Sequence, residues 1–181
     1  MRKMLAIGSL MILCCLALAA PGVAQQDKSK RPSPPEQTKC MLPGGQTIAV
    51  DYSSPRMKGR KIFGDLVPYG EVWRAGANEA TTFVTSADLM VGDKVVPAGN
   101  YTLFTIPEHG KWTLIVSKKT GEWGIPYPGE GSDLVRTEMQ VSELPSALED
   151  FTIRLVLKGD GCTMQMEWAN TRASVAISPK K

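Results

Sequence analysis

Apolar and polar residues alternate along much of the chain. In residues 46–52, every second residue from Ile48 to Tyr52 is apolar. The same alternation occurs in residues 111–117, 133–141, 151–158, 162–168 and 173–177. A period of two residues is typical of antiparallel strands that bury one face. The pattern therefore predicts a series of short, half-buried strands.

Turn-forming residues separate these alternating segments. The clearest case is the sequence GDG at residues 159–161, which predicts a hairpin between two strands. Residues 142–150 predict at most one short helical turn, with Ser142 as its cap and Pro145 near its start. We therefore predict an all-β fold, an antiparallel, jelly-roll-like β-sandwich of about nine strands with one long ordered loop.

The N-terminal residues have the order of a secretory signal peptide. Arg2 and Lys3 precede an apolar run, and small residues follow it up to Ala24. A retained membrane anchor is the alternative interpretation. Residues 25–37 are rich in proline and charge and predict a linker, so we expect one β-sandwich domain at residues 38–178. The predicted location is periplasmic or secreted.

Charge and composition argue against several classes of function. The chain has 181 residues and a formal net charge of +3, of which Arg2 and Lys3 account for two charges. A nearly neutral domain is not expected to bind nucleic acid, or a membrane after the signal peptide is cleaved. The one histidine, His109, follows an apolar segment at an expected turn and cannot form a histidine-cluster metal site. Phosphate-binding glycine motifs are absent too, so we predict no metal and no cofactor.

Two cysteines, Cys40 and Cys162, lie outside the predicted signal peptide. In an oxidising compartment such a pair is expected to form a disulfide that closes a long loop. Two separate buried thiols are the alternative, because the sequence does not give the distance between the two residues.

Residues 53–80 break the alternating pattern. The segment combines glycines and prolines with enough apolar residues to be ordered. It also contains a basic run, Arg56, Lys58, Arg60 and Lys61, which predicts either an anion site or a solvated face. Long segments without regular structure inside a compact domain are usually functional when they are ordered.

Three stretches between residues 52 and 107 resemble a known family. YSSPRMKGRKIFG, LVPYGEVWRAGANEATTF and VPAGNYTLFTIP are similar to the bacterial family called domain of unknown function 2911. The resemblance extends from about residue 46 to 177, and WRAGANEAT at 73–81 is its most specific part. It implies an exported, β-rich bacterial protein and implies no activity.

Polar and aromatic residues of the long segment form the candidate ligand site. Arginine grips carboxylates and phosphates, amides both donate and accept, and aromatic rings stack on flat faces. The candidate residues are Tyr69, Trp73, Arg74, Asn78 and Glu79, with Arg56 and Arg60 assisting. The expected ligand is a small molecule, a glycan or an envelope protein.

Two alternatives to a binding site stay open. The chain is a hydrolase-type enzyme if Glu79 acts as the acid or base and Arg74 stabilises charge. It is a structural or assembly module if Arg74 and Glu79 pair with each other and with loop carbonyls, and so only lock the loop.

Overall fold

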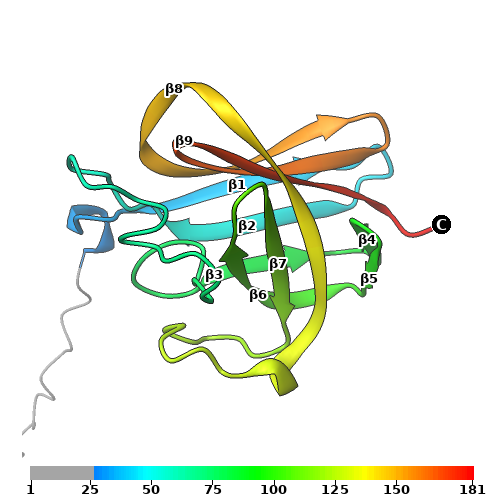
Figure 1. Cartoon of the computed structure of the whole chain (residues 1–181). Helices are drawn as coiled ribbons and strands as arrows, with labels where there is room; N and C mark the ends of the chain where they lie inside the picture. Colours follow the sequence, from blue (N-terminus) through cyan, green and yellow to red (C-terminus); the bar gives the residue numbers. More distant parts are fainter. Residues whose placement is uncertain (1–26) are drawn as a thin grey trace, which may run out of the picture.

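The computed structural model describes residues 27–181, so the predicted signal peptide lies outside the described residues. Nine strands and two three-residue 3-10 helices make up its regular structure (Figure 1). The helices are η1 (Lys28–Lys30) and η2 (Glu130–Ser132). The strands are β1 (Pro35–Met41), β2 (Thr47–Ser53), β3 (Thr81–Thr85), β4 (Leu89–Val91), β5 (Lys94–Val96), β6 (Gly99–Pro107), β7 (Lys111–Ser117), β8 (Asp133–Lys158) and β9 (Gly161–Pro179). The predicted all-β, nine-stranded fold is confirmed.

All nine strands belong to one antiparallel sheet, in the order β1-β2-β3-β6-β7-β8-β9-β4-β5. The two longest strands, β8 and β9, fold this sheet over on itself. The first part of β8 pairs with β7, and its last part pairs with β9 through the predicted hairpin at 159–161. The hairpin lies over β1 and β2 (Figure 1), which gives two layers without closing a barrel.

The prediction of a short helical turn at residues 142–150 is wrong, because these residues belong to β8. The register with β9 shifts twice here, between Glu143 and Leu148 and between Leu148 and Thr152. Such irregularities bend a strand. Pro145 lies between paired residues, where the ladder needs no N–H from it. The bend is what carries β8 over the core.

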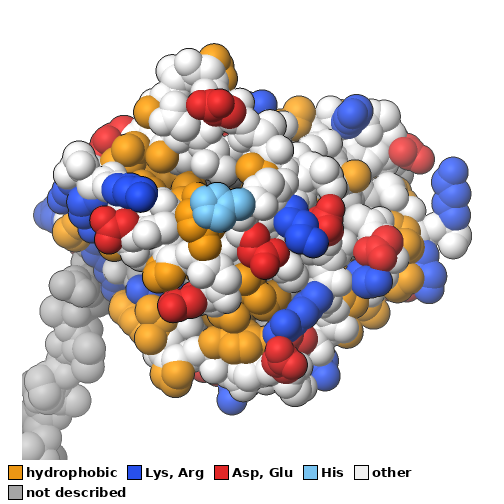
Figure 2. Space-filling model, viewed as in Figure 1, with side chains coloured by type: hydrophobic (Ala, Val, Ile, Leu, Met, Phe, Trp, Pro, Cys, Tyr) orange, Lys and Arg blue, Asp and Glu red, His pale blue; other side chains and the backbone are white. Residues whose placement is uncertain are grey.

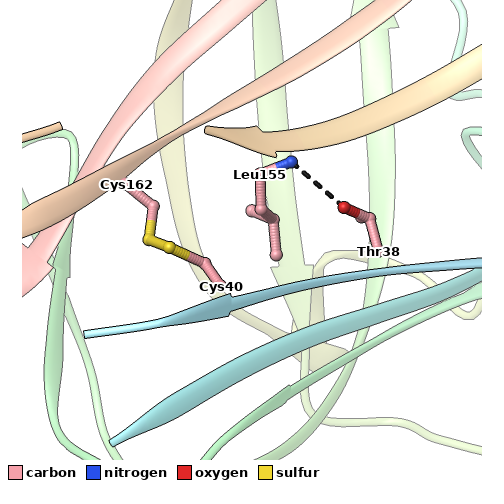
Figure 3. Close-up of a disulfide and its surroundings, with 4 residues drawn as sticks. All are labelled: Thr38, Cys40, Leu155 and Cys162. Carbon is pink, nitrogen blue, oxygen red and sulfur yellow. Dashed lines mark hydrogen bonds between the residues drawn. A yellow bond between two sulfur atoms is a disulfide. The ribbon is translucent and has the colours of Figure 1, made fainter. Parts of the chain in front are cut away.

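A disulfide joins the two layers. Cys40 of β1 and Cys162 of β9 are bonded, with Cα atoms 6.7 Å apart, which confirms the predicted pairing (Figure 3). Beside it, the backbone N–H of Leu155 in β8 donates to the Thr38 hydroxyl at 3.2 Å. Both contacts hold edge strand β1 against the β8–β9 hairpin.

The core between the layers combines alternating strand residues with side chains of the long segment. Ile48 and Val50 of β2 are fully buried, as the alternation predicts. Phe63 of residues 53–80 packs its ring 4.9 Å from Trp112 of β7 and 6.4 Å from Trp168 of β9. The segment is therefore an ordered part of the core. Across residues 27–181, none of the helices has the length and apolarity needed to cross a membrane.

Candidate functional site

Trp73 is positioned by a backbone bridge between the long segment and β6. Its N–H donates to the Thr105 carbonyl at 2.7 Å, and the Thr105 N–H donates back at 2.8 Å. The indole stacks on Trp168 with ring centroids 5.9 Å apart and 17° between the planes. Phe151 and Phe63 approach the same indole with their edges, at 4.9 and 6.5 Å. The side chain is nevertheless partly exposed.

A pocket of about 370 Å³ lies against this pair of tryptophans. The partly exposed Trp73 provides aromatic surface, with the buried Trp168 behind it, and Leu66 and Ile125 add apolar surface. Leu66 and Ile125 are 44% and 65% exposed. Figure 2 shows hydrophobic side chains gathered on the side of the molecule where the long segment and the 118–132 segment lie. The pocket therefore combines an aromatic wall with apolar residues that remain open to solvent.

Arg74 lies in the wall of this pocket and joins two loops. Its Nη1 donates to the carbonyls of Asn78 at 2.6 Å and Trp123 at 2.9 Å. Its guanidinium also lies 5.5 Å from the centre of the Trp123 ring. The close approach needs Gly124, where a Cβ atom would stand only 3.0 Å from the Cβ of Arg74. Burial lowers the pKa of Arg74, with partial compensation from the charge of Glu79.

Glu79 does not form an ion pair with Arg74. The structure thus differs from the alternative in which these two side chains pair with each other to lock the loop. Its carboxylate accepts from Lys28 Nζ at 2.9 Å and from Arg31 Nη1 at 2.8 and 3.0 Å. The hydrogen bond from Lys28 is the main reason that the pKa of Glu79 falls from 4.5 to about 2. Glu79 therefore holds the N-terminal segment, residues 27–34, against the domain.

Asn78 supports the same contact. Its backbone has φ of 57°, a left-handed conformation that asparagine tolerates. Its side-chain Nδ2 donates to the Ser33 carbonyl at 2.9 Å. Ser33 in turn lines the tryptophan pocket, so the N-terminal segment forms part of the pocket wall.

Of the remaining candidates, Arg60 lines the tryptophan pocket, whereas Arg56 and Tyr69 lie outside it. Arg60 lines the pocket, with Nε and Nη2 bonded to the carbonyls of Met57 and Arg56 at 2.9 and 2.6 Å. Arg56 instead pairs with Asp150 of β8, its Nε 2.9 Å from the carboxylate. Tyr69 packs on His109 with ring centroids 4.0 Å apart, and His109 is exposed. Of the seven predicted residues, the structure thus brings Arg60, Trp73 and Arg74 to one pocket.

Eight of the eleven lining residues were not among the candidates; five of these lie within residues 53–80, and three, Ser33, Ile125 and Trp168, lie outside that segment. Trp168 ends the alternating segment at residues 162–168, and no signal in the sequence placed it against Trp73. Ser33 and Ile125 lie far from the other lining residues in the chain and come to them only through the fold. No group of three or more histidine, cysteine, aspartate or glutamate side chains in residues 27–181 is arranged to hold a metal ion.

Comparison with known families now adds one finding. A family model described as "Protein of unknown function (DUF2911)" matches residues 33–177. The chain belongs to this family. No curated protein and no solved structure matches the chain.

The DUF2911 region contains every residue that lines the tryptophan pocket, from Ser33 to Trp168. The two cations that hold Glu79, Lys28 and Arg31, lie just before it in the sequence. The pocket is thus built within the DUF2911 domain, whereas the contact that pins the N-terminal segment also uses residues outside it.

Proposed function

We propose that this DUF2911 protein is an exported, non-catalytic binding module, and that it takes up a small molecule in the pocket beside Trp73 and Trp168. The observation that carries the proposal is the exposed part of Trp73, stacked on the buried Trp168, in a pocket of about 370 Å³. Binding sites for small molecules are typically concave, about 300–1,000 Å³, and lined by aromatic and apolar side chains with a few polar groups.

Binding is favoured over catalysis by the chemistry of the lining. The residues around the pocket include no carboxylate, imidazole or thiol. Glu79, the candidate acid or base, is engaged by Lys28 and Arg31, and its pKa of about 2 keeps it ionised. A general acid must carry a proton near the working pH, and a carboxylate of such low pKa is a weak base. Both facts speak against a hydrolase that uses Glu79.

A purely structural role for the loop is less well supported. Arg74 does lock two loops through the carbonyls of Asn78 and Trp123. A lock alone, however, needs no open pocket beside it, whereas here Arg74 lies in the wall of a pocket that also exposes part of Trp73. Export is supported by the Cys40–Cys162 disulfide and by the signal-like N-terminal sequence.

A thermal-shift screen with a pocket-filling variant tests the proposal. The panel contains aromatic acids, aromatic amides, and mono- and disaccharides. Ala77 lines the pocket, so Ala77→Leu should fill it; Ala98, exposed in the turn before β6, gives the matched control Ala98→Leu. We expect at least one compound to raise the Tm of the wild type and of Ala98→Leu but not of Ala77→Leu. Stabilisation that persists in Ala77→Leu, or no stabilisation by any compound, would contradict the proposed site.

A further inference from the structure

We infer that the pocket beside Trp73 and Trp168 is specific for an anion, a molecule with a flat apolar body and a carboxylate or phosphate group. The body would lie against the exposed part of Trp73, which stacks on the buried Trp168, and the anionic group would be held by Arg60 and Arg74. The inference rests on the proposed function and names the ligand class of the same site.

The two arginines that line this pocket differ from the other described arginines, because neither has a carboxylate partner. Residues 27–181 contain seven arginines. Five of them have a carboxylate within 4.0 Å, namely Arg31, Arg56, Arg136, Arg154 and Arg172. In this described part of the chain, Arg60 and Arg74 are the two without such a partner, and both line the same pocket. Two cations that share a pocket and have no carboxylate partner favour an anionic ligand.

The neighbouring pocket shows the opposite arrangement. It measures about 150 Å³ and is also lined by two cations, Lys28 and Arg31, but Glu79 lies between them and Asp51 lines it too. Its positive charge is compensated within the protein. Glu79 is close enough to affect the pKa of Arg74, yet its own hydrogen bonds go to Lys28 and Arg31. The tryptophan pocket therefore keeps an excess of positive charge.

Both guanidinium groups are already oriented. Backbone carbonyls accept from two N–H groups of Arg60, and from Nη1 of Arg74. A guanidinium has five N–H groups, so donors remain for a ligand on each side chain. Side chains that are held in place before binding lose less conformational entropy when a ligand arrives. Carboxylates and phosphates are the anions that the planar arginine group binds best.

Three naphthalene compounds test the inference, because they share one flat body and differ in charge. We propose isothermal titration of the protein with 2-naphthoate, 2-naphthyl phosphate and the neutral 2-naphthamide. At least one anion is expected to bind about tenfold or more tightly than the amide, as expected for a charge-assisted hydrogen bond. The tighter of the two anions tells whether the site prefers a carboxylate or a phosphate.

Arginine variants locate the charge. Arg60→Gln and Arg74→Gln should each weaken binding of the anion by about fivefold to tenfold and leave the amide unchanged. Lys94→Gln removes a positive charge outside the pocket and should change neither affinity. Because Arg74 also joins two loops, Arg74→Lys serves as the variant that keeps the charge, and it should bind the anion more tightly than Arg74→Gln.

The outcomes separate this inference from the proposed function. If the amide and the anions bind with equal affinity, and Ala77→Leu abolishes binding of all three, the inference is wrong but the proposed binding pocket is supported. Anion affinity that falls as much in Lys94→Gln as in the two arginine variants would also overturn it. If none of the three compounds binds, the inference fails, and the screen with Ala77→Leu and Ala98→Leu decides the proposed function separately.

Discussion

Arg31 and Glu79 form an ion pair, with Nη1 2.8 Å from Oε2, between the N-terminal segment and the loop that also carries Trp73. Lys28 pairs with the same carboxylate at 2.9 Å. The hydrogen bond from Asn78 to the Ser33 carbonyl adds a third contact. These contacts turn a proline-rich stretch, which composition alone describes as a tether, into a wall of the pocket.

Removing the charge of Glu79 should release the N-terminal segment. Ion pairs between partly exposed groups contribute up to about 1 kcal/mol, so we expect trypsin to cleave after Lys28 and Lys30 about twofold to fivefold faster in Glu79→Gln. Glu71→Gln is the control. Glu71 is an exposed glutamate of the same loop and forms no ion pair within residues 27–181, so trypsin should cleave this variant at the wild-type rate. Equal cleavage of all three proteins would show that Glu79 does not hold the segment.

The same contact should depend on pH. The folded state lowers the pKa of Glu79 from 4.5 to about 2. A lowered carboxylate pKa stabilises the fold above the unfolded value, and this contribution is lost as the pH falls from about 4.5 towards 2. We therefore expect the Tm of the wild type to be higher than that of Glu79→Gln at neutral pH. This difference in Tm should shrink as the pH falls from about 4.5 towards 2. A difference in Tm that stays constant down to pH 2 would contradict the assignment.

Phe63 should be essential to stability although it lies in a loop. Its side chain is 8% exposed and packs against Trp112, Trp168 and Trp73. Replacing a buried phenylalanine by alanine typically costs about 3–5 kcal/mol, so Phe63→Ala should lower the free energy of unfolding by that amount in a urea titration. Leu66→Ala, in the same segment but 44% exposed, should cost less than about 1 kcal/mol. Similar losses in both variants would mean that residues 53–80 do not pack as described.

The disulfide should be a large contributor to stability. Cys40 and Cys162 are separated by 122 positions, and closing a loop of that size limits the unfolded chain by about 4–5 kcal/mol in the chain-entropy model. Reduction should lower the urea midpoint of the wild type and leave the double variant Cys40→Ala/Cys162→Ala unaffected. Alkylation that reaches both cysteines without reductant would refute the bond.

Periodicity predicted the strands whose faces differ sharply. β2 buries every second residue over residues 48–52, and β9 does so over residues 162–168, so their alternation was visible in the sequence. β7 alternates only over residues 111–114 and is buried on both faces over residues 114–117. β1 was not recognised, because Cys40 is its one fully buried residue and the rest of the strand reads as polar linker. The irregular middle of β8 was mistaken for a helical turn for a related reason, since a bend interrupts the alternation.

The candidate site was predictable in part. Local composition singled out the segment that carries Trp73, Arg74 and Glu79, and two of these three line the pocket. The partners of Glu79 could not be inferred, because Arg31 is 48 positions away and nothing in the sequence signals contacts of that range. Trp168 was hidden for the same reason, as its stacking on Trp73 depends on how the sheet folds over.

The central claim is that a small molecule binds against Trp73 and Trp168. The chain has four tryptophans, and their indole N–H signals in a ¹H–¹⁵N NMR spectrum report on each separately. During a titration with 2-naphthoate, we expect the signal of the partly exposed Trp73 to shift most and that of Trp112, which is buried and does not line the pocket, to shift least. If the signal of Trp73 stays in place while the compound binds, the pocket is not the binding site.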